Sequence, residues 1–239
     1  MSNLKLSYIQ KIILKLYYFK SKIVKNPFLN IPTYKNKFNK FNDFIIEKTS
    51  FSNGSFFNLR SYQIFYLLKK FNIKNIIEIG SGRTTFLFNI LDGLSVISYE
   101  QDFEWQKLML EAFSICDIKK PNIQLRDIES YKNGGRLIGL DKLSCDLLYI
   151  DGPYLYKKNN HKFNTYTGKA CFYDFETFFN KNFYPKLIMV DGRTDTVDEI
   201  LKFSKNKYKF IPEMIFCIER NKLFSSLLFS RHSLFIRKD

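Results

Sequence analysis

Acidic residues follow several short apolar segments of the sequence, and their positions indicate a ligand site. Each segment has the length and composition of a buried strand. In an open α/β sheet, ligands bind beyond the carboxyl ends of parallel strands. Carboxylates at a buried edge are costly unless they meet donors such as ligand hydroxyls, ammonium groups or metal ions. One such Asp alone would also fit a helix N-cap. The acids in these positions are Glu78, Glu100, Asp127, Asp151 and Asp191.

A glycine turn, Gly80-Ser81-Gly82, follows the first of these segments. Glycine lets the backbone pass close to a ligand. The third glycine of a dinucleotide fingerprint is absent, because Thr85 stands in its place. Glu78 would repel a diphosphate and would suit a ligand with an ammonium group. Glu100 ends the next predicted strand, where a carboxylate can accept both hydroxyls of a ribose. These features argue against a nicotinamide oxidoreductase.

The elements that would position these residues alternate between strands and helices, which predicts a parallel sheet covered on both faces. Residues 26–58 show no clear period and are predicted to form a loop-rich connection. The apolar runs predict strands at 75–79, 95–100, 122–126, 146–151, 186–191, 215–218 and 233–237. Helical spacing predicts helices at 4–25, 64–71, 84–91, 102–113, 174–180 and 196–203.

Glu78-Ile-Gly-Ser-Gly82, Glu100 and Asp127 resemble the first three cofactor motifs of the class I S-adenosylmethionine-dependent methyltransferases. The resemblance covers about residues 60–239. The glycine motif is common, and it gains specificity from Glu100 on the next strand. Thr84 departs from the pattern, since many members have a third glycine there. The Gly-Ser-Gly-x-Thr form resembles a branch that acts on small molecules and glycans.

The resemblance implies roles for the cofactor residues. Gly80, Ser81 and Gly82 would pass beneath the methionine part of S-adenosyl-L-methionine. Glu100 would hold the ribose, and Asp127 would lie near the adenine. The cofactor set would then be Glu78, Gly80, Ser81, Gly82, Glu100, Asp127 and Asp151.

The resemblance also implies the fold class and the domain division. We expect an α/β, Rossmann-like three-layer sandwich with a mostly parallel seven-stranded sheet and an antiparallel C-terminal strand. An N-terminal helical and loop extension would span residues 1–55. The S-adenosylmethionine-binding methyltransferase domain would span residues 56–239.

Asp151-Gly-Pro-Tyr154 ends the fourth strand, which lies beside the transferred methyl group in this family. In one interpretation Asp151 takes the proton of an alcohol acceptor. Asp191 would then join it, with a divalent cation between them as in catechol-type O-methyltransferases. Gly192 departs from that family's ligand pair, so a metal is not favoured. In the other interpretation the segment resembles the Asp-Pro-Pro-Tyr motif of amino-methyltransferases that act on bases. Gly152 is the departure from that motif.

A long loop at 154–173 follows this strand, and loops of this length near an active face are commonly functional. His161 is a candidate catalytic base, because its ordinary pKa suits neutral pH, or else a solvated loop residue. Tyr154 and Lys158 are candidate substrate contacts, and the basic loop would suit an acidic substrate. Arg193 either pairs with Asp191 or reaches a carboxylate on the substrate.

The formal net charge of +15 has two interpretations. Lysine dominates a chain that is also rich in Asn, Ile, Phe and Tyr, which favours a compositional bias. Nucleic-acid-binding surfaces depend more on arginine, so a nucleic-acid partner is the less favoured alternative and stays open. The 4–25 helix either packs on the domain or contacts an anionic membrane surface.

The chain has no predicted transmembrane segment and no predicted signal peptide. The cysteines are scattered without a Cys-x-x-Cys pair, which predicts free thiols and a cytoplasmic protein. They are Cys116, Cys145, Cys171 and Cys217. In the alternative where residues 4–25 contact a membrane, the contact would be peripheral and at its inner surface.

The sequence therefore predicts an enzyme, an S-adenosylmethionine-dependent methyltransferase that O-methylates a sugar or another small hydroxylated molecule. Two alternatives stay open. One is a nucleic-acid N-methyltransferase. The other is a non-catalytic Rossmann-like protein that binds a membrane or a partner.

Overall fold

The computed structural model describes residues 31–49, 57–141, 143–152, 171–204, 206–213 and 232–238, with the backbone alone at 57–59. Within the predicted 4–25 helix it describes Tyr8, Ile12, Lys15 and Leu16, which are helical and exposed. The rest of that helix lies outside the described residues.

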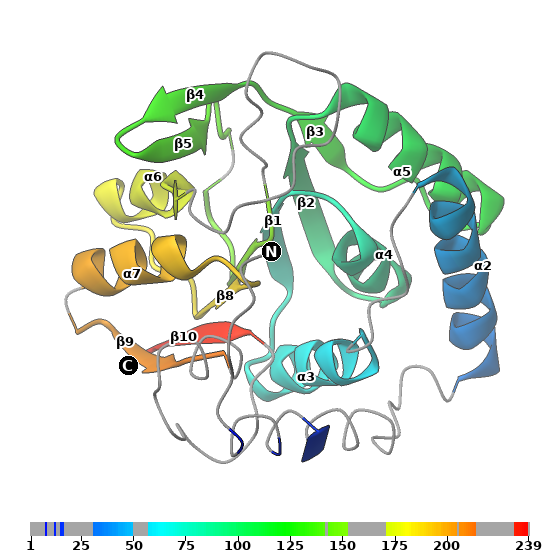
Figure 1. Cartoon of the computed structure of the whole chain (residues 1–239), viewed down its shortest axis with the longest axis horizontal. Helices are drawn as coiled ribbons and strands as arrows, with labels where there is room; N and C mark the ends of the chain where they lie inside the picture. Colours follow the sequence, from blue (N-terminus) through cyan, green and yellow to red (C-terminus); the bar gives the residue numbers. More distant parts are fainter. Residues whose placement is uncertain are drawn as a thin grey trace.

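A seven-stranded sheet forms the middle layer, in the order β3-β2-β1-β6-β8-β10-β9 (Figure 1). Strand β10 is antiparallel to both of its neighbours, and the other pairings in the sheet are parallel. The predicted mostly parallel seven-stranded sheet with an antiparallel C-terminal strand is thus confirmed. Its strands are β1 (Asn75–Ile79), β2 (Ser95–Glu100), β3 (Ile123–Leu125), β6 (Leu147–Ile150), β8 (Leu187–Val190), β9 (Tyr208–Ile211) and β10 (Ser233–Arg237).

The structure adds strands that the sequence pattern did not predict. The seventh strand is β9, whereas the strand predicted at 215–218 lies outside the described residues. A separate three-stranded sheet has the order β4-β5-β7. Its strands are short and carry few apolar residues in sequence, so no periodicity marks them. They are β4 (Ile128–Tyr131), β5 (Gly134–Leu137) and β7 (Cys171–Phe172).

The three central strands end at the same level. Ile79 pairs with Ile150, and Ile150 pairs with Val190. Main-chain hydrogen bonds continue one residue further, from Asp151 N to Ile79 O (3.0 Å) and from Asp191 N to Ile150 O (2.9 Å). The register therefore places the residues after β1, β6 and β8 side by side at one edge of the sheet.

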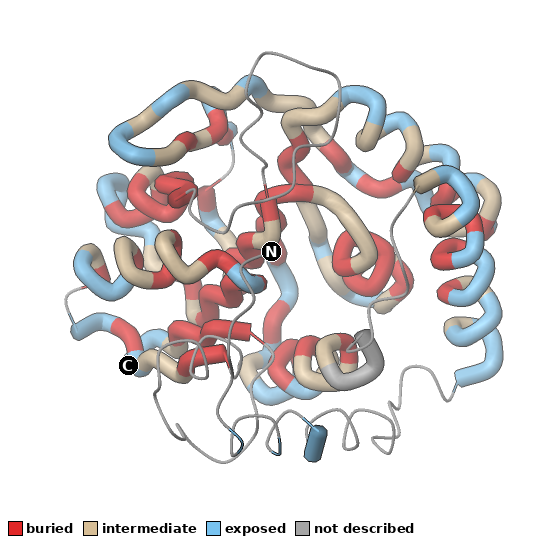
Figure 2. The backbone as a smooth tube through the Cα atoms, viewed as in Figure 1, coloured by how far each residue is buried: buried red, intermediate tan, exposed pale blue. Residues whose placement is uncertain are grey.

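Helices cover both faces of the sheet (Figure 1). The core on one face combines side chains of α2, α4 and α5 with Tyr149 and Met189 of the sheet, and the core on the other combines α6 and α7 with Ile150 and Val190. Figure 2 shows buried residues along the strands and exposed residues on the outer sides of the helices. No helix in the described part of the chain is long and apolar enough to span a membrane. The helices are α2 (Pro32–Lys48), α3 (Phe57–Lys70), α4 (Arg83–Ile90), α5 (Phe103–Ile115), α6 (Asp174–Asn180) and α7 (Thr194–Phe203).

The prediction of a loop-rich connection over 26–58 is wrong, because α2 occupies much of it. Proline is favoured in the first turn of a helix, where Pro32 lies. Phe38 and Phe41 face inward one turn apart, and the Asn and Lys residues between them dilute the apolar signal. The Phe41 ring lies 4.4 Å from that of Phe86 and 6.0 Å from that of Phe113, measured between centroids. Helix α2 thus belongs to the same core as α4 and α5.

We predict that Phe41→Ala lowers the free energy of unfolding by about 3–5 kcal/mol, the usual cost of removing a buried aromatic ring. Urea unfolding measures the change. Phe103→Ala is the matched control, because Phe103 is 59% exposed, and it should cost well under 1 kcal/mol. Equal effects of the two substitutions would contradict the packing of α2 in the core.

Candidate functional site

Glu78 lies on β1 with its carboxylate completely buried. Three hydroxyl groups donate to it: Thr84 at 2.5 Å, Thr85 at 2.6 Å and Ser98 at 2.6 Å. Burial raises the pKa of Glu78 to about 7, although these hydrogen bonds oppose the shift. The carboxylate thus meets its donors inside the protein, and it joins β1 to β2 and to the first turn of α4.

The glycine turn after β1 is held against the end of β6. Gly80 has a φ of +85°, which favours glycine. A Cβ atom added at Gly80 or at Gly152 would lie 2.4 Å from the Cα of the other. Gly152 N also donates to Ile79 O at 2.7 Å, a bond that proline lacks. The second residue of an Asp-Pro-Pro-Tyr motif therefore cannot be accommodated here, which weakens the amino-methyltransferase interpretation.

Glu100 ends β2 beside this turn, with only 6% of its surface exposed. Its Oε2 accepts hydrogen bonds from Ser81 N (2.9 Å) and Ser81 Oγ (2.8 Å). Its Oε1 accepts from the main-chain N–H groups of Gln101 (2.8 Å) and Asp102 (3.1 Å). Trp105 Nε1 donates to Ser81 O at 2.8 Å. This role of Trp105 was not predicted from the sequence. Its indole N–H fixes the main chain of the turn at Ser81.

Asp127 follows β3 and is exposed. Its main-chain oxygen accepts from Ile138 N at 2.9 Å, which begins the hairpin of β4 and β5. Its place near an adenine stays a prediction.

Asp151 and Asp191 lie side by side after β6 and β8, as the strand-end rule predicts. Asp191 is 7% exposed, and its Oδ2 lies 2.6 Å from Nη1 of Arg60 on α3. Burial lowers the pKa of Arg60, but the negative charge of Asp191, with smaller contributions from Asp151 and Glu213, raises it above its ordinary value. The described residues hold no group of three acidic, histidine or cysteine side chains that could bind a metal ion.

Arg193, 3% exposed, donates from Nη2 to the main-chain oxygen of Asp151 and lies 4.9 Å from the Phe172 ring. Asp191 forms an ion pair with Arg60, which was not predicted from the sequence. Glu213 was also missed. It lies two residues beyond β9, and its Oε2 accepts from Gly192 N at 3.1 Å. Because β9 is parallel to β8, Glu213 is another acid at the same sheet edge.

A row of polar side chains in contact with one another connects the start of β10 to β6 and α3. His232, just before β10, is completely buried. Its Nε2 lies 3.2 Å from the Tyr149 hydroxyl, and its Nδ1 lies 3.1 Å from Gln63 Oε1 on α3. Burial raises the pKa of Tyr149, as do the negative charges of Asp191 and Asp151, so its hydroxyl stays protonated. This row of side chains fixes α3, and with it Arg60, against the sheet.

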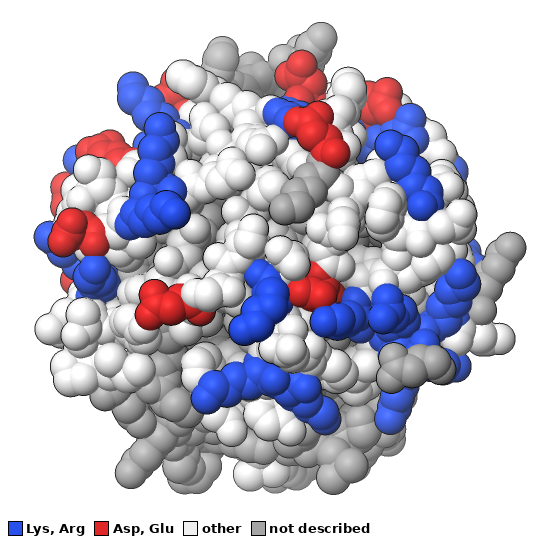
Figure 3. Space-filling model, turned by 180° about the vertical axis from the view of Figure 1, so that it is seen from behind, with Lys and Arg blue, Asp and Glu red and all other residues white. Residues whose placement is uncertain are grey.

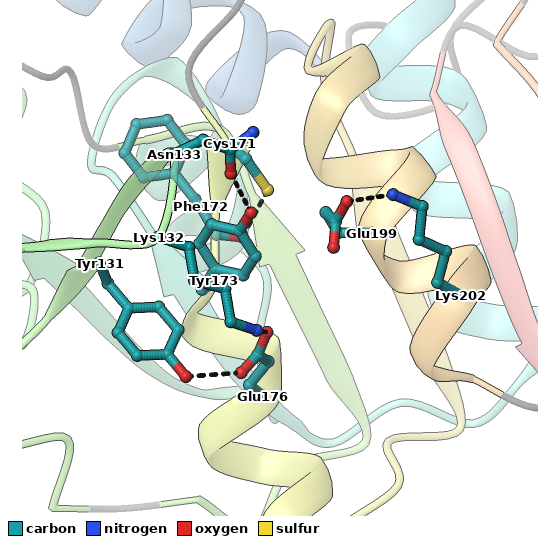
Figure 4. A network of polar contacts seen from close by, with 9 residues as sticks. All are labelled: Tyr131, Lys132, Asn133, Cys171, Phe172, Tyr173, Glu176, Glu199 and Lys202. Atoms are coloured by element: carbon teal, nitrogen blue, oxygen red, sulfur yellow. Dashed lines mark hydrogen bonds and ion pairs between the residues drawn. The ribbon is translucent and has the colours of Figure 1, made fainter.

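Another polar network joins the small sheet to α6 (Figure 4). Lys132 Nζ lies 2.5 Å from Glu176 Oε1 and 4.8 Å from the centre of the Tyr173 ring. The Tyr173 hydroxyl donates to Asn133 Oδ1. Burial raises the pKa of the Cys171 thiol to about 11, so it is protonated at neutral pH and is a poor nucleophile.

The described cysteines, Cys116, Cys145 and Cys171, are free thiols, as predicted. Cys217 lies outside the described residues, and so do the loop candidates Tyr154, Lys158 and His161.

Methyltransferases are among the solved structures that are similar to this chain. No protein-family model and no curated protein sequence matches this chain. A methyltransferase from Podospora anserina with S-adenosylhomocysteine bound is 12% identical, with a TM-score of 0.53 over 100% of both chains. An O-methyltransferase from Bacillus cereus in complex with the same compound is 10% identical, with a TM-score of 0.50 over 94% of this chain and 97% of its own. The chain thus has the Rossmann-like methyltransferase fold, as predicted.

We predict that Glu78→Gln alters the pH dependence of stability. Because the folded pKa is raised to about 7, the contribution of Glu78 is complete below its unfolded value and is lost as pH rises through about 7. Between pH 5 and pH 8 the wild type should therefore lose about 2.5 kcal/mol relative to Glu78→Gln, at about 1.4 kcal/mol per pKa unit, because a smaller part is already lost at pH 5. Urea unfolding at both pH values measures this. A pH-independent difference, like that expected for the exposed control Glu104→Gln, would refute the assignment.

Proposed function

We propose that this protein is an S-adenosylmethionine-dependent methyltransferase that methylates a hydroxyl oxygen of a small molecule. The observation that carries the proposal is the Glu100 carboxylate, which four donors hold at the carboxyl edge of the sheet beside the glycine turn. A nearly buried carboxylate fixed in this place is suited to the two hydroxyls of a ribose.

The residues of the turn fit the cofactor. Three of the four donors to Glu100 are main-chain N–H groups, whereas the Ser81 hydroxyl can rotate away and be replaced by a ribose hydroxyl. Among the described residues, no atom lies within 4 Å of the position that a Cβ would take at Gly82, which is consistent with room for the methionine part. Asp127 would lie near the adenine. Glu78 would act on the cofactor through the turn that it holds in place.

The acceptor would lie beyond β6 and β8. When bound, S-adenosylmethionine supplies a methyl group on a positively charged sulfur. Asp151 would accept the proton of the acceptor hydroxyl, with Asp191 beside it. Most of the rate would come from the alignment of acceptor and cofactor. Arg193 positions Asp151 through its main-chain oxygen, and Tyr154, Lys158 and His161 would contact the acceptor.

We propose a sugar, or a similar hydroxylated molecule, as the acceptor. The Gly-Ser-Gly-x-Thr form of the turn supports this acceptor. So does Gly152, because the proline of the amino-methyltransferase motif would not fit at this position. Incubation of the protein with S-adenosylmethionine and a panel of sugars, uronic acids and catechols, followed by mass spectrometry for a gain of one methyl group, would identify it.

A cytoplasmic location with peripheral membrane contact is part of the proposal. Tyr8, Ile12 and Leu16, spaced one helical turn apart, are 78%, 40% and 58% exposed, which supports an apolar surface. Binding of the full chain to vesicles with anionic lipid, lost in Ile12→Glu, would support this contact.

The nucleic-acid alternative has one specific observation in its favour. Figure 3 shows lysine and arginine side chains that outnumber the acidic ones over one face of the molecule. Binding to DNA or RNA that falls steeply with salt would favour this function. Its absence at moderate salt would dismiss it.

We predict that Glu100→Gln weakens S-adenosylhomocysteine binding at least about tenfold, because charge-assisted hydrogen bonds to the ribose are lost. Isothermal titration calorimetry measures the affinity. Glu111→Gln, an exposed substitution on α5, should leave the affinity unchanged. Wild-type protein that does not bind S-adenosylhomocysteine at all would contradict the proposed function.

We predict that Asp151→Asn lowers the rate of methyl transfer at least about 100-fold, the lower range for loss of general base catalysis, and changes the affinity for S-adenosylhomocysteine less than threefold. Rates of product formation and calorimetry give the two values. Equal losses in both would make Asp151 a cofactor-binding or structural residue.

A further inference from the structure

We infer that the guanidinium of Arg60 takes the place that a divalent metal ion has in cation-dependent O-methyltransferases, and that this protein takes up no metal ion between Asp151 and Asp191. This inference rests on the proposed function, because only a methyltransferase would bind its acceptor beside Asp151 and Asp191.

The contacts of Asp191 carry the inference. Its Oδ2 lies 2.6 Å from Arg60 Nη1, and the pair is largely buried, with 6% of the Asp191 side chain and 23% of the Arg60 side chain exposed. A guanidinium at this distance holds the oxygen that a metal ion would need as a ligand. It also places a positive charge where a second cation would be repelled.

The acidic side chains near Asp191 also act on the positive charge of Arg60. Asp151, next to Asp191 in the sheet, and Glu213, whose Oε2 accepts from Gly192 N at 3.1 Å, both act electrostatically on Arg60. Arg60 is therefore paired with Asp191, while the carboxylates of Asp151 and Glu213 add to the negative potential around it. Burial, and next the positive charge of Arg60, lower the pKa of Arg83 on α4.

Helix α3, which carries Arg60, is held against the sheet by a second polar contact. Gln63, one turn further along α3, lies 3.1 Å from His232 Nδ1, and His232 in turn contacts the Tyr149 hydroxyl. Arg60 is thus a positioning residue. Its charge favours the ionised forms of Asp151 and Asp191, so that a carboxylate is available to accept the proton of the acceptor.

The direct test is a titration of the wild-type protein with MnCl2 and with MgCl2, with and without S-adenosylhomocysteine, followed by calorimetry and by thermal unfolding. We expect no saturable heat and no shift in Tm up to millimolar metal ion. A saturable site with a Kd below 1 mM that Asp191→Asn abolishes would overturn the inference. Failure of the proposed function appears separately, as the absence of S-adenosylhomocysteine binding.

A second test removes the cation. In Arg60→Met the Asp191 carboxylate and its neighbour Asp151 lose their counter-ion, and burial without a counter-charge disfavours their ionised forms. The stability that they contribute is then present at low pH and is lost as pH rises. In the described part of the chain, the charged and titratable groups around the Arg60–Asp191 pair include Tyr149 from β6, Asp151 at the end of β6, Glu213 beyond β9 and Arg193 before α7.

We expect the Tm difference between wild type and Arg60→Met to grow between pH 5 and pH 8. Arg60→Lys, which keeps the charge, should show a much smaller pH dependence. Lys186→Met is the matched control, because Lys186 lies 2.9 Å from Asp146 Oδ1 at the opposite end of the strands and is 42% exposed. A pH-independent loss of Tm in Arg60→Met, as expected for a packing defect alone, would overturn the role. If Arg60→Met does not fold, Arg60→Lys and the metal titration decide.

Discussion

The buried carboxylate of Glu78 is the interaction on which the site depends. Its hydroxyl partners Thr84, Thr85 and Ser98 come from the first turn of α4 and from β2, so one carboxylate ties three elements together. Thr85 Oγ1 also accepts from Gly82 N at 2.7 Å, which fixes the glycine turn. A buried acid that is not fully paired would be costly, so these partners must fold as a unit.

The carboxyl edge of the sheet has two regions of different charge, one on each side of β1. On one side of β1, the Glu100 carboxylate accepts hydrogen bonds from Ser81 and from two further main-chain N–H groups. On the other side, Asp191 lies next to Asp151 and forms an ion pair with Arg60. The close approach of Gly80 and Gly152 brings the two regions together. A cofactor on the first side and an acceptor on the second would therefore meet over this backbone contact.

Much of this site could be predicted from the sequence, because strand-end acids follow directly from local apolar runs. Glu78, Glu100, Asp151 and Asp191 were found in this way. Glu213 obeys the same rule and was missed only because β9 has a weak apolar pattern.

Other features had no local signal. Arg60 and Asp191 are distant in sequence, and only the folded chain brings them together. Helix α2 was missed for a different reason, since its inward-facing Phe side chains are separated by Asn and Lys. The partners of His232 likewise come from α3 and β6.

A crystal structure of the protein with S-adenosylhomocysteine would test the central claim most directly. The account predicts both ribose hydroxyls within hydrogen-bond distance of the Glu100 carboxylate, and the sulfur facing the edge where Asp151 and Asp191 lie, with the Arg60–Asp191 ion pair intact. A nucleoside bound away from Glu100, or a metal ion between Asp151 and Asp191 with Arg60 displaced, would contradict it.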